Sequence, residues 1–133
     1  MILTAQVLPL AAGLLLFITF WVLLRLSSSS AYRARMEAER RAELLLSEIL
    51  RPEEYRQLKR KGYLDIPSPS RPHRTYRVPR SRDQVRVYEE GRLIERLCIQ
   101  SIEPVPYADV VVMHKLMIEA NEDEYLRVAN HFT

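Results

Sequence analysis

The sequence has few of the residues from which most catalytic sites are built. Its 133 residues include only three glycines, three histidines and one cysteine. Three glycines leave little material for the loops that cradle phosphates, and no G-x-S-x-G or H-E-x-x-H pattern occurs. The single Cys98 agrees with a reducing compartment. The sequence therefore predicts a protein that is not an enzyme and that holds no cofactor.

Charge is absent from the first 24 residues, which are rich in Leu, Ile, Val and Phe. A helix over these residues would be about 36 Å long, and a hydrocarbon core is about 30 Å thick. A cleaved signal peptide is the alternative, but it needs positive charge before the apolar run and a small-x-small site after it. Neither is present, so we predict a transmembrane anchor over residues 1–26.

Five residues of this segment have expected roles in the membrane. Trp21 and Arg25 lie near one end, where an indole and a guanidinium can reach the headgroups. Ala12, Gly13 and Thr19 are small or weakly polar, and we interpret them as possible contacts with neighbouring helices.

Positive charge predicts the orientation of the anchor. No Lys or Arg precedes the span, whereas several arginines follow it closely, at positions 25, 33, 35, 40 and 41. Since basic residues stay on the cytoplasmic side, we expect the N-terminus outside the inner cell membrane and the remaining chain in the cytoplasm. Residues 25–62 carry a net charge of +4 and residues 63–133 of −1. This distribution favours weak contact with anionic lipids, and the interleaved acidic residues disfavour nucleic acid.

Residues 27–51 are predicted to form a polar joint and a helical stalk. Ser27–Ser30 is either a flexible hinge or a helix start, with Ser30 as the capping residue. Helix formers dominate 31–50, and the apolar second half of this segment is expected to enter the core of the domain beyond. A coiled coil is the alternative, but the apolar positions do not sustain three heptads.

Residues 52–133 are predicted to form a small α+β cytoplasmic domain. Pro52 suits a first helical position, and Gly62 suits a helix end. Strands are expected over 63–66, 75–78, 84–88 and 92–100, the last with Leu93, Leu97 and Ile99 on one face. A three-residue hairpin loop that ends at Gly91 is expected before the last strand. A helix is expected between Pro106 and residue 120, where a valine triplet also permits a strand. A final short helix is expected from Asn121, with the apolar residues Tyr125, Leu126, Val128 and Ala129. The fold class is thus an antiparallel meander of about four strands flanked by helices.

Several short segments, over about residues 45–132, together resemble a small domain of uncharacterised bacterial proteins. They are Gly62-Tyr63-Leu64-Asp65-Ile66, Tyr76-Arg77-Val78, Leu97-Cys98-Ile99, His114-Lys115-Leu116-Met117 and Ala129-Asn130. The resemblance implies a helix that ends in Gly plus an aromatic residue, and a final helix that closes on Ala-Asn. It implies no activity.

A series of arginines is the strongest candidate for a contact surface. In a strand, Arg at alternate positions is also the ordinary solvent face. The alternatives are a plain surface, a protein or lipid contact, and nucleic-acid phosphate. The series consists of Arg71, Arg74, Arg77, Arg80, Arg82 and Arg86.

Cys98 and the histidines are the other candidates for chemistry. His73, His114 and His131 have no zinc-like spacing with Cys98, so no metal site is expected. Three functions follow. The leading one is a non-enzymatic accessory or assembly subunit of a larger membrane complex, respiratory, photosynthetic or similar. The second is a membrane-tethered recruiter that binds a soluble protein or anionic lipid through the arginines. The third is a small enzyme with Cys98 as nucleophile, paired with His114.

Overall fold

A computed structural model of the chain describes residues 2–133, with side chains from Ala12 onward. The chain divides into two compact units, one up to Glu37 and one from Ala38 to Thr133. The first helix, α1 (Ile2–Ile49), contributes to both units. Each unit is described by itself.

The unit up to Glu37 is helical, and its sequence carries no charge before Arg25. In the described part of the chain, one helix, near the N-terminus, is long and apolar enough to cross a membrane, with a mean hydropathy of 1.7 in its most apolar window. The helix continues through the predicted joint Ser27–Ser30. The hydroxyls of Ser28, Ser29 and Ser30 donate to backbone carbonyls three residues earlier, at 2.8–3.0 Å. These serines therefore bond within the helix, and Ser30 is not a helix cap.

The domain from Ala38 to Thr133 begins with the end of α1. Ala42, Leu46 and Leu50 belong to its hydrophobic core, as the apolar second half of the stalk predicts. The chain then turns into α2 (Pro52–Lys61), which starts at Pro52 as expected. Gly62 ends α2 with a φ of 75°, a left-handed conformation that glycine adopts without strain.

Five antiparallel strands follow one another in a single sheet of order β1-β2-β3-β4-β5. The four predicted strands are present as β1 (Tyr63–Pro67), β2 (Arg74–Pro79), β3 (Val85–Glu89) and β4 (Arg92–Cys98). The expected number of about four is one too low, because β5 (Asn130–Phe132) pairs with β4 at the C-terminus. The α+β class and the antiparallel meander are confirmed.

The β3–β4 hairpin differs from the expectation in two ways. Its loop has two residues rather than three: Glu89 pairs with Arg92, and Glu90 and Gly91 have φ values of 50° and 78°. Two left-handed residues are typical of the type I′ turn. A bulge at Ile94 then shifts the register between the pairs of Val87 and Tyr88.

The bulge also corrects the predicted core face of β4. Leu93 and Leu97 were expected on one face, but a residue inserted between them places them on opposite faces. Leu97 is fully buried, whereas Leu93 is 42% exposed.

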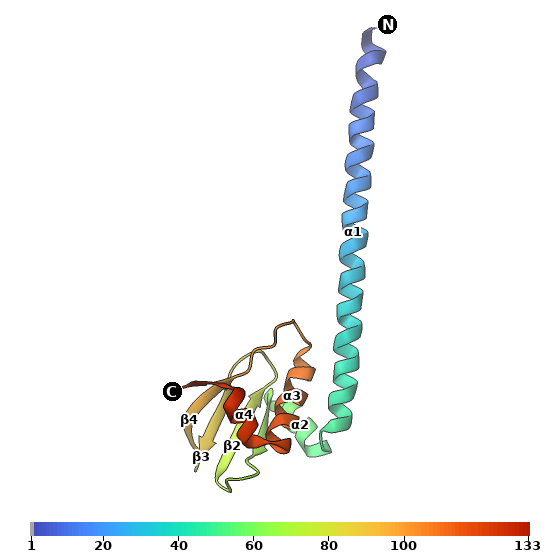
Figure 1. The fold of residues 1–133 in the computed structure, drawn as a ribbon. Helices are drawn as coiled ribbons and strands as arrows, with labels where there is room; N and C mark the ends of the chain where they lie inside the picture. Colours follow the sequence, from blue (N-terminus) through green and yellow to red (C-terminus); the bar gives the residue numbers. More distant parts are fainter. Residues whose placement is uncertain (1) are drawn as a thin grey trace. The chain divides into compact units, whose positions relative to one another are not determined.

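Two helices complete the domain and lie against the sheet (Figure 1). The valine triplet is helical, within α3 (Tyr107–Ala120). Asn121 caps α4 (Glu122–Val128) by accepting from the Glu124 amide at 3.1 Å. The final helix does not close on Ala-Asn, because Ala129 is already extended and leads into β5.

The core lies between these helices and the inner face of the sheet. Tyr76 of β2 and Tyr125 of α4 are fully buried and meet edge to face, with ring centroids 5.9 Å apart. Alternate strand residues point away from this core. The outer face of the sheet therefore carries Asp65, Arg77 and Arg86, which the register places side by side.

Candidate functional site

The six arginines of the predicted contact surface do not form one surface. Arg74 lies on the inner face of β2, is 7% exposed and has a carboxylate of Glu89 at 3.4 Å. Its Nε is the only enclosed side-chain nitrogen or oxygen without a partner among the described residues. Arg71 is exposed in the loop before β2. These two residues lie apart from the outer face.

Two further arginines are held by acidic residues of the domain. Arg77 donates to both carboxylate oxygens of Asp65, at 2.8 and 3.1 Å, and its guanidinium stacks over the rings of Tyr63 and Tyr88. Hydrogen bonding to Asp65 raises the pKa of Arg77 further. Arg80 is paired with Glu43.

Glu43 links the end of α1 to α2 and to the β2–β3 loop. It accepts hydrogen bonds from Tyr55, Lys59 and Arg80. Burial alone would raise its pKa, but these three donors outweigh burial and lower it to about 2. Arg80 is thus part of an internal ion-pair network, which explains its position without a partner molecule.

Of the remaining two arginines of the series, Arg86 lies on the outer face of the sheet and Arg82 lies in the loop between β2 and β3. Arg86 of β3 lies directly opposite Arg96 of β4, and both are exposed. In the part of the chain that the structure describes, neither guanidinium has an ion pair. Together with Arg82 they line a shallow hollow, which we call the arginine hollow. Its lining residues are Arg82, Asp83, Gln84, Arg86 and Arg96.

Like charges directly opposite one another in a sheet are destabilising, by up to about 1 kcal/mol. Asp83 is the one acidic residue of the hollow, and its carboxylate accepts from the hydroxyl of Ser81 at 2.6 Å. The arginine hollow thus has a net positive charge and free guanidinium donors. It is suited to carboxylates or phosphates on another molecule.

The side chains that were assigned to the membrane are exposed along α1. Arg25 lies over the ring of Trp21, with its guanidinium carbon 5.1 Å from the centroid. Thr19 donates to the carbonyl of Leu16 at 2.9 Å, so its hydroxyl is already bonded within the helix. Ala12 is exposed, and a Cβ at Gly13 would meet nothing within 4 Å. The surface at these small residues is therefore open to a neighbouring helix.

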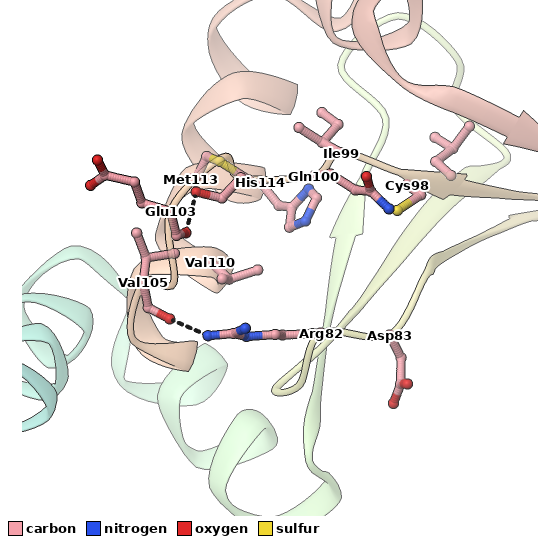
Figure 2. Close-up of a pocket in the computed structure, with 12 residues that line it drawn as sticks. Arg82, Asp83, Cys98, Ile99, Gln100, Glu103, Val105, Val110, Met113 and His114 are labelled. Atoms are coloured by element: carbon pink, nitrogen blue, oxygen red, sulfur yellow. Dashed lines mark hydrogen bonds between the residues drawn. The ribbon is translucent and has the colours of Figure 1, made fainter. Parts of the chain in front are cut away.

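A second hollow, a cavity of about 270 Å³, lies at the end of β4 (Figure 2). We call it the β4 cavity. Cys98 and His114 both line it, so the fold brings together the two residues that sequence reasoning paired. Its other walls come from the loop after β4, from α3 and from Arg82. The apolar lining residues are Leu97, Ile99, Val105, Val110 and Met113.

His114 is the buried polar residue of this cavity. Its side chain belongs to α3 and is 4% exposed, and its Nδ1 lies 2.9 Å from the hydroxyl of Tyr125. Burial lowers the pKa of His114 to about 4 and raises that of Tyr125. The imidazole is therefore neutral at pH 7, and the pair acts through hydrogen bonds rather than charge.

The geometry does not favour Cys98 as a nucleophile. Among the described residues, no hydrogen bond joins its sulfur to His114, whose Nδ1 is engaged by Tyr125. A base must reach the proton that it removes, and a neutral imidazole gives a thiolate no charge stabilisation. No group of three or more His, Cys, Asp or Glu side chains in the described part of the chain is placed to hold a metal ion.

Comparison with protein families, curated proteins and solved structures gave no match to this chain.

Sequence reasoning missed two residues of these sites. Arg96 was not in the predicted series, and only the bulge in β4 places it opposite Arg86. Tyr125 was predicted only as an apolar residue of the last helix, and its bond to His114 depends on the packing of α4 against α3. No signal in the sequence indicates either contact.

Proposed function

We propose that this chain is a non-enzymatic, single-span membrane protein that serves as an accessory or assembly subunit of a larger membrane complex, respiratory, photosynthetic or similar. Its domain contacts an acidic surface of a partner subunit through the arginine hollow. The observation that carries this proposal is the placement of Arg86 opposite Arg96 without an acidic partner for either.

The bulge in β4 strengthens the argument. A regular two-residue hairpin that pairs Glu89 with Arg92 would pair Arg86 with Glu95, an attractive pair. The bulge at Ile94 instead moves Glu95 opposite Val87 and brings Arg96 opposite Arg86. Bulges often re-aim side chains next to functional sites. A carboxylate-rich partner would relieve the repulsion that this register creates.

Three other arginines of the series are already paired within the domain, which limits the contact surface to the arginine hollow. Arg74, Arg77 and Arg80 already have carboxylate partners within the domain. A second molecule would have to compete with those intramolecular pairs. Arg82, Arg86 and Arg96 line the same hollow and have no ion pair among the described residues, although Arg82 donates one hydrogen bond to the carbonyl of Val105.

The apolar helix supports the membrane part of the proposal. We propose an anchor in the inner cell membrane with the N-terminus outside and the domain in the cytoplasm, because Arg25 and the arginines that follow it would remain inside. Trp21 and Arg25 would then lie at the headgroups, and lipids would be direct neighbours. Ala12, Gly13 and Thr19 would offer a close approach to helices of other subunits.

Native gel electrophoresis after mild detergent extraction tests the subunit role. We expect the protein to migrate in an assembly much larger than its own 15.6 kDa. Raised salt should release it, because exposed charge pairs are screened by ions. Migration of the extracted protein at its own mass would contradict the proposal.

Vesicle flotation distinguishes the recruiter that binds lipid. The full chain is reconstituted in zwitterionic nanodiscs and mixed with vesicles that contain or lack phosphatidylserine. If the arginine hollow binds an acidic protein surface, the nanodiscs should not float with either kind of vesicle. Salt-sensitive flotation with the anionic vesicles alone, abolished by Arg86→Glu, would favour a lipid surface instead.

A further inference from the structure

The β4 cavity has the features of a small-molecule site that is separate from the arginine hollow, although Arg82 borders both. Its volume of about 270 Å³ lies at the lower limit of ligand pockets, which measure about 300–1,000 Å³. Apolar side chains with a few convergent polar groups are typical of such pockets. The identity of the polar groups then indicates the class of ligand.

The hydrogen bond between Tyr125 and His114 determines which ring nitrogen of His114 carries the proton. The hydroxyl of Tyr125 is fully buried, and Nδ1 of His114 is its only hydrogen-bond partner among the described residues. A buried hydroxyl needs an acceptor for its proton, so Tyr125 donates and Nδ1 accepts. Because the ring is neutral, the remaining proton lies on Nε2.

The Nε2–H group has no protein acceptor in the described part of the chain. Among the described residues, however, Arg74 Nε is the only fully enclosed side-chain nitrogen or oxygen without a hydrogen-bond partner, so Nε2 of His114 is not fully enclosed. Nε2 therefore retains an opening, and the opening available to it is the cavity that His114 lines. A buried ring thus presents one hydrogen-bond donor to an otherwise largely apolar cavity.

Arg82 is the cationic residue among those that line the cavity, and Asp83 and Glu103 are the acidic ones. Its guanidinium donates to the carbonyl of Val105 at 3.4 Å and lies over the ring of Tyr107. Figure 2 shows the carboxyl groups of Asp83 and Glu103 directed away from the ring of His114. The acidic residues of the rim therefore do not occupy the donors.

We propose that the β4 cavity binds a small monocarboxylate with a short hydrocarbon chain. One carboxylate oxygen accepts the Nε2–H of His114, the charge is balanced by Arg82, and the hydrocarbon contacts Leu97, Ile99 and Met113. Tyr125 is a positioning residue, since its hydroxyl keeps the proton of His114 on Nε2.

The test uses the full chain, labelled with ¹⁵N-histidine, in zwitterionic nanodiscs. Hexanoate is the probe, and hexanol and hexylamine are its matched controls without the negative charge. We expect hexanoate to shift the Nε2 resonance of His114 saturably, hexanol to do so at higher concentration, and hexylamine to leave it unmoved. His73 and His131 lie outside the cavity and provide internal controls.

Variants make the test specific to the proposed contacts. Arg82→Gln should weaken hexanoate about fivefold, as expected for one partly solvated charge contact, whereas Arg71→Gln should leave the affinity unchanged. Tyr125→Phe should shift the proton between the two ring nitrogens of His114, which the ¹⁵N chemical shifts report directly. Amide spectra confirm that each variant is folded.

Two results would overturn the proposal. The first is a His114 resonance that does not respond to hexanoate in the folded wild-type protein. The second is an equal response to hexanoate and hexylamine, which would show that hydrocarbon alone is recognised.

Discussion

Replacement of Glu122 by Gln is the perturbation whose outcome the structure determines most fully. Glu122 begins α4, is 6% exposed, and ties that helix to the loop between β1 and β2. One carboxylate oxygen accepts from the hydroxyls of Ser68, at 2.6 Å, and Tyr76. The other accepts from the hydroxyl and the amide of Ser70, at 2.6 and 3.0 Å. An amide side chain places a donor where one of these oxygens accepts.

The pKa of Glu122 determines how much Glu122→Gln should lower the free energy of unfolding and how this loss should depend on pH. Burial alone would raise this pKa, but the hydrogen bonds from Ser68, Ser70 and Tyr76 outweigh burial and lower it from 4.5 to about 2. A carboxyl whose pKa is depressed in the folded state stabilises the fold above the unfolded pKa, and this contribution is lost as pH falls through the folded value. The linked free energy is about 3 kcal/mol at pH 7 and about 1.5 kcal/mol at pH 3.

Urea unfolding of the full chain in nonionic detergent, followed by far-ultraviolet circular dichroism, measures this effect. Glu122→Gln should lower the free energy of unfolding by about 3 kcal/mol at pH 7, and its difference from wild type should shrink by about 1.5 kcal/mol at pH 3. The neighbouring Asp123 is exposed, and Asp123→Asn should change stability by less than about 0.5 kcal/mol. A difference for Glu122→Gln that stays constant between pH 7 and pH 3 would refute the assigned pKa.

Three further substitutions test the packing, the hairpin and a buried charge, with urea midpoints as the measurement. Leu46→Ala should lower the free energy of unfolding by about 2–5 kcal/mol, because Leu46 is fully buried. Leu45→Ala, at a 44% exposed position, should have little effect. Equal losses would contradict the placement of the end of α1 in the core. Gly91→Ala should lower the free energy of unfolding by about 1 kcal/mol, since a φ of 78° strains any residue with a Cβ. An unchanged urea midpoint would contradict the two-residue turn. Lys115→Gln should lower the free energy of unfolding by about 1.5 kcal/mol, because the buried Glu54 loses the ammonium group at 3.0 Å and keeps only Arg51, whose side chain is 66% exposed; an unchanged midpoint would contradict this buried ion pair.

The fold could be predicted from local signals where those signals are strong. Pro52 and Gly62 bound α2 as expected, and the alternation of apolar residues located four strands. The strand β5 was missed because its three residues gain their hydrogen bonds only from the edge of β4. The helical state of Ser27–Ser30 was left open, since serine favours caps as well as i−3 bonds within helices.

The candidate sites could be predicted only in part, for reasons of register and long-range packing. A period of two residues predicts which side chains of an ideal strand share a face, but a bulge changes that pairing beyond it. The bulge at Ile94 therefore exchanged Glu95 for Arg96 opposite Arg86. The arginine series is visible in the sequence, but the sequence does not show that Arg77 and Arg80 are paired with Asp65 and Glu43, which lie well before them in the chain.

Charge reversal at the arginine hollow tests the central claim most directly. The measurement is the native-gel position of the full chain, extracted in mild detergent from the membranes of cells that express it at its natural level. The account predicts that Arg86→Glu with Arg96→Glu shifts the protein from the larger assembly to its own mass, while Arg71→Glu, at an exposed position outside the hollow, leaves it in the assembly. An assembly that withstands the double reversal, with the variant folded and inserted in the membrane, would contradict the claim that the arginine hollow holds the partner.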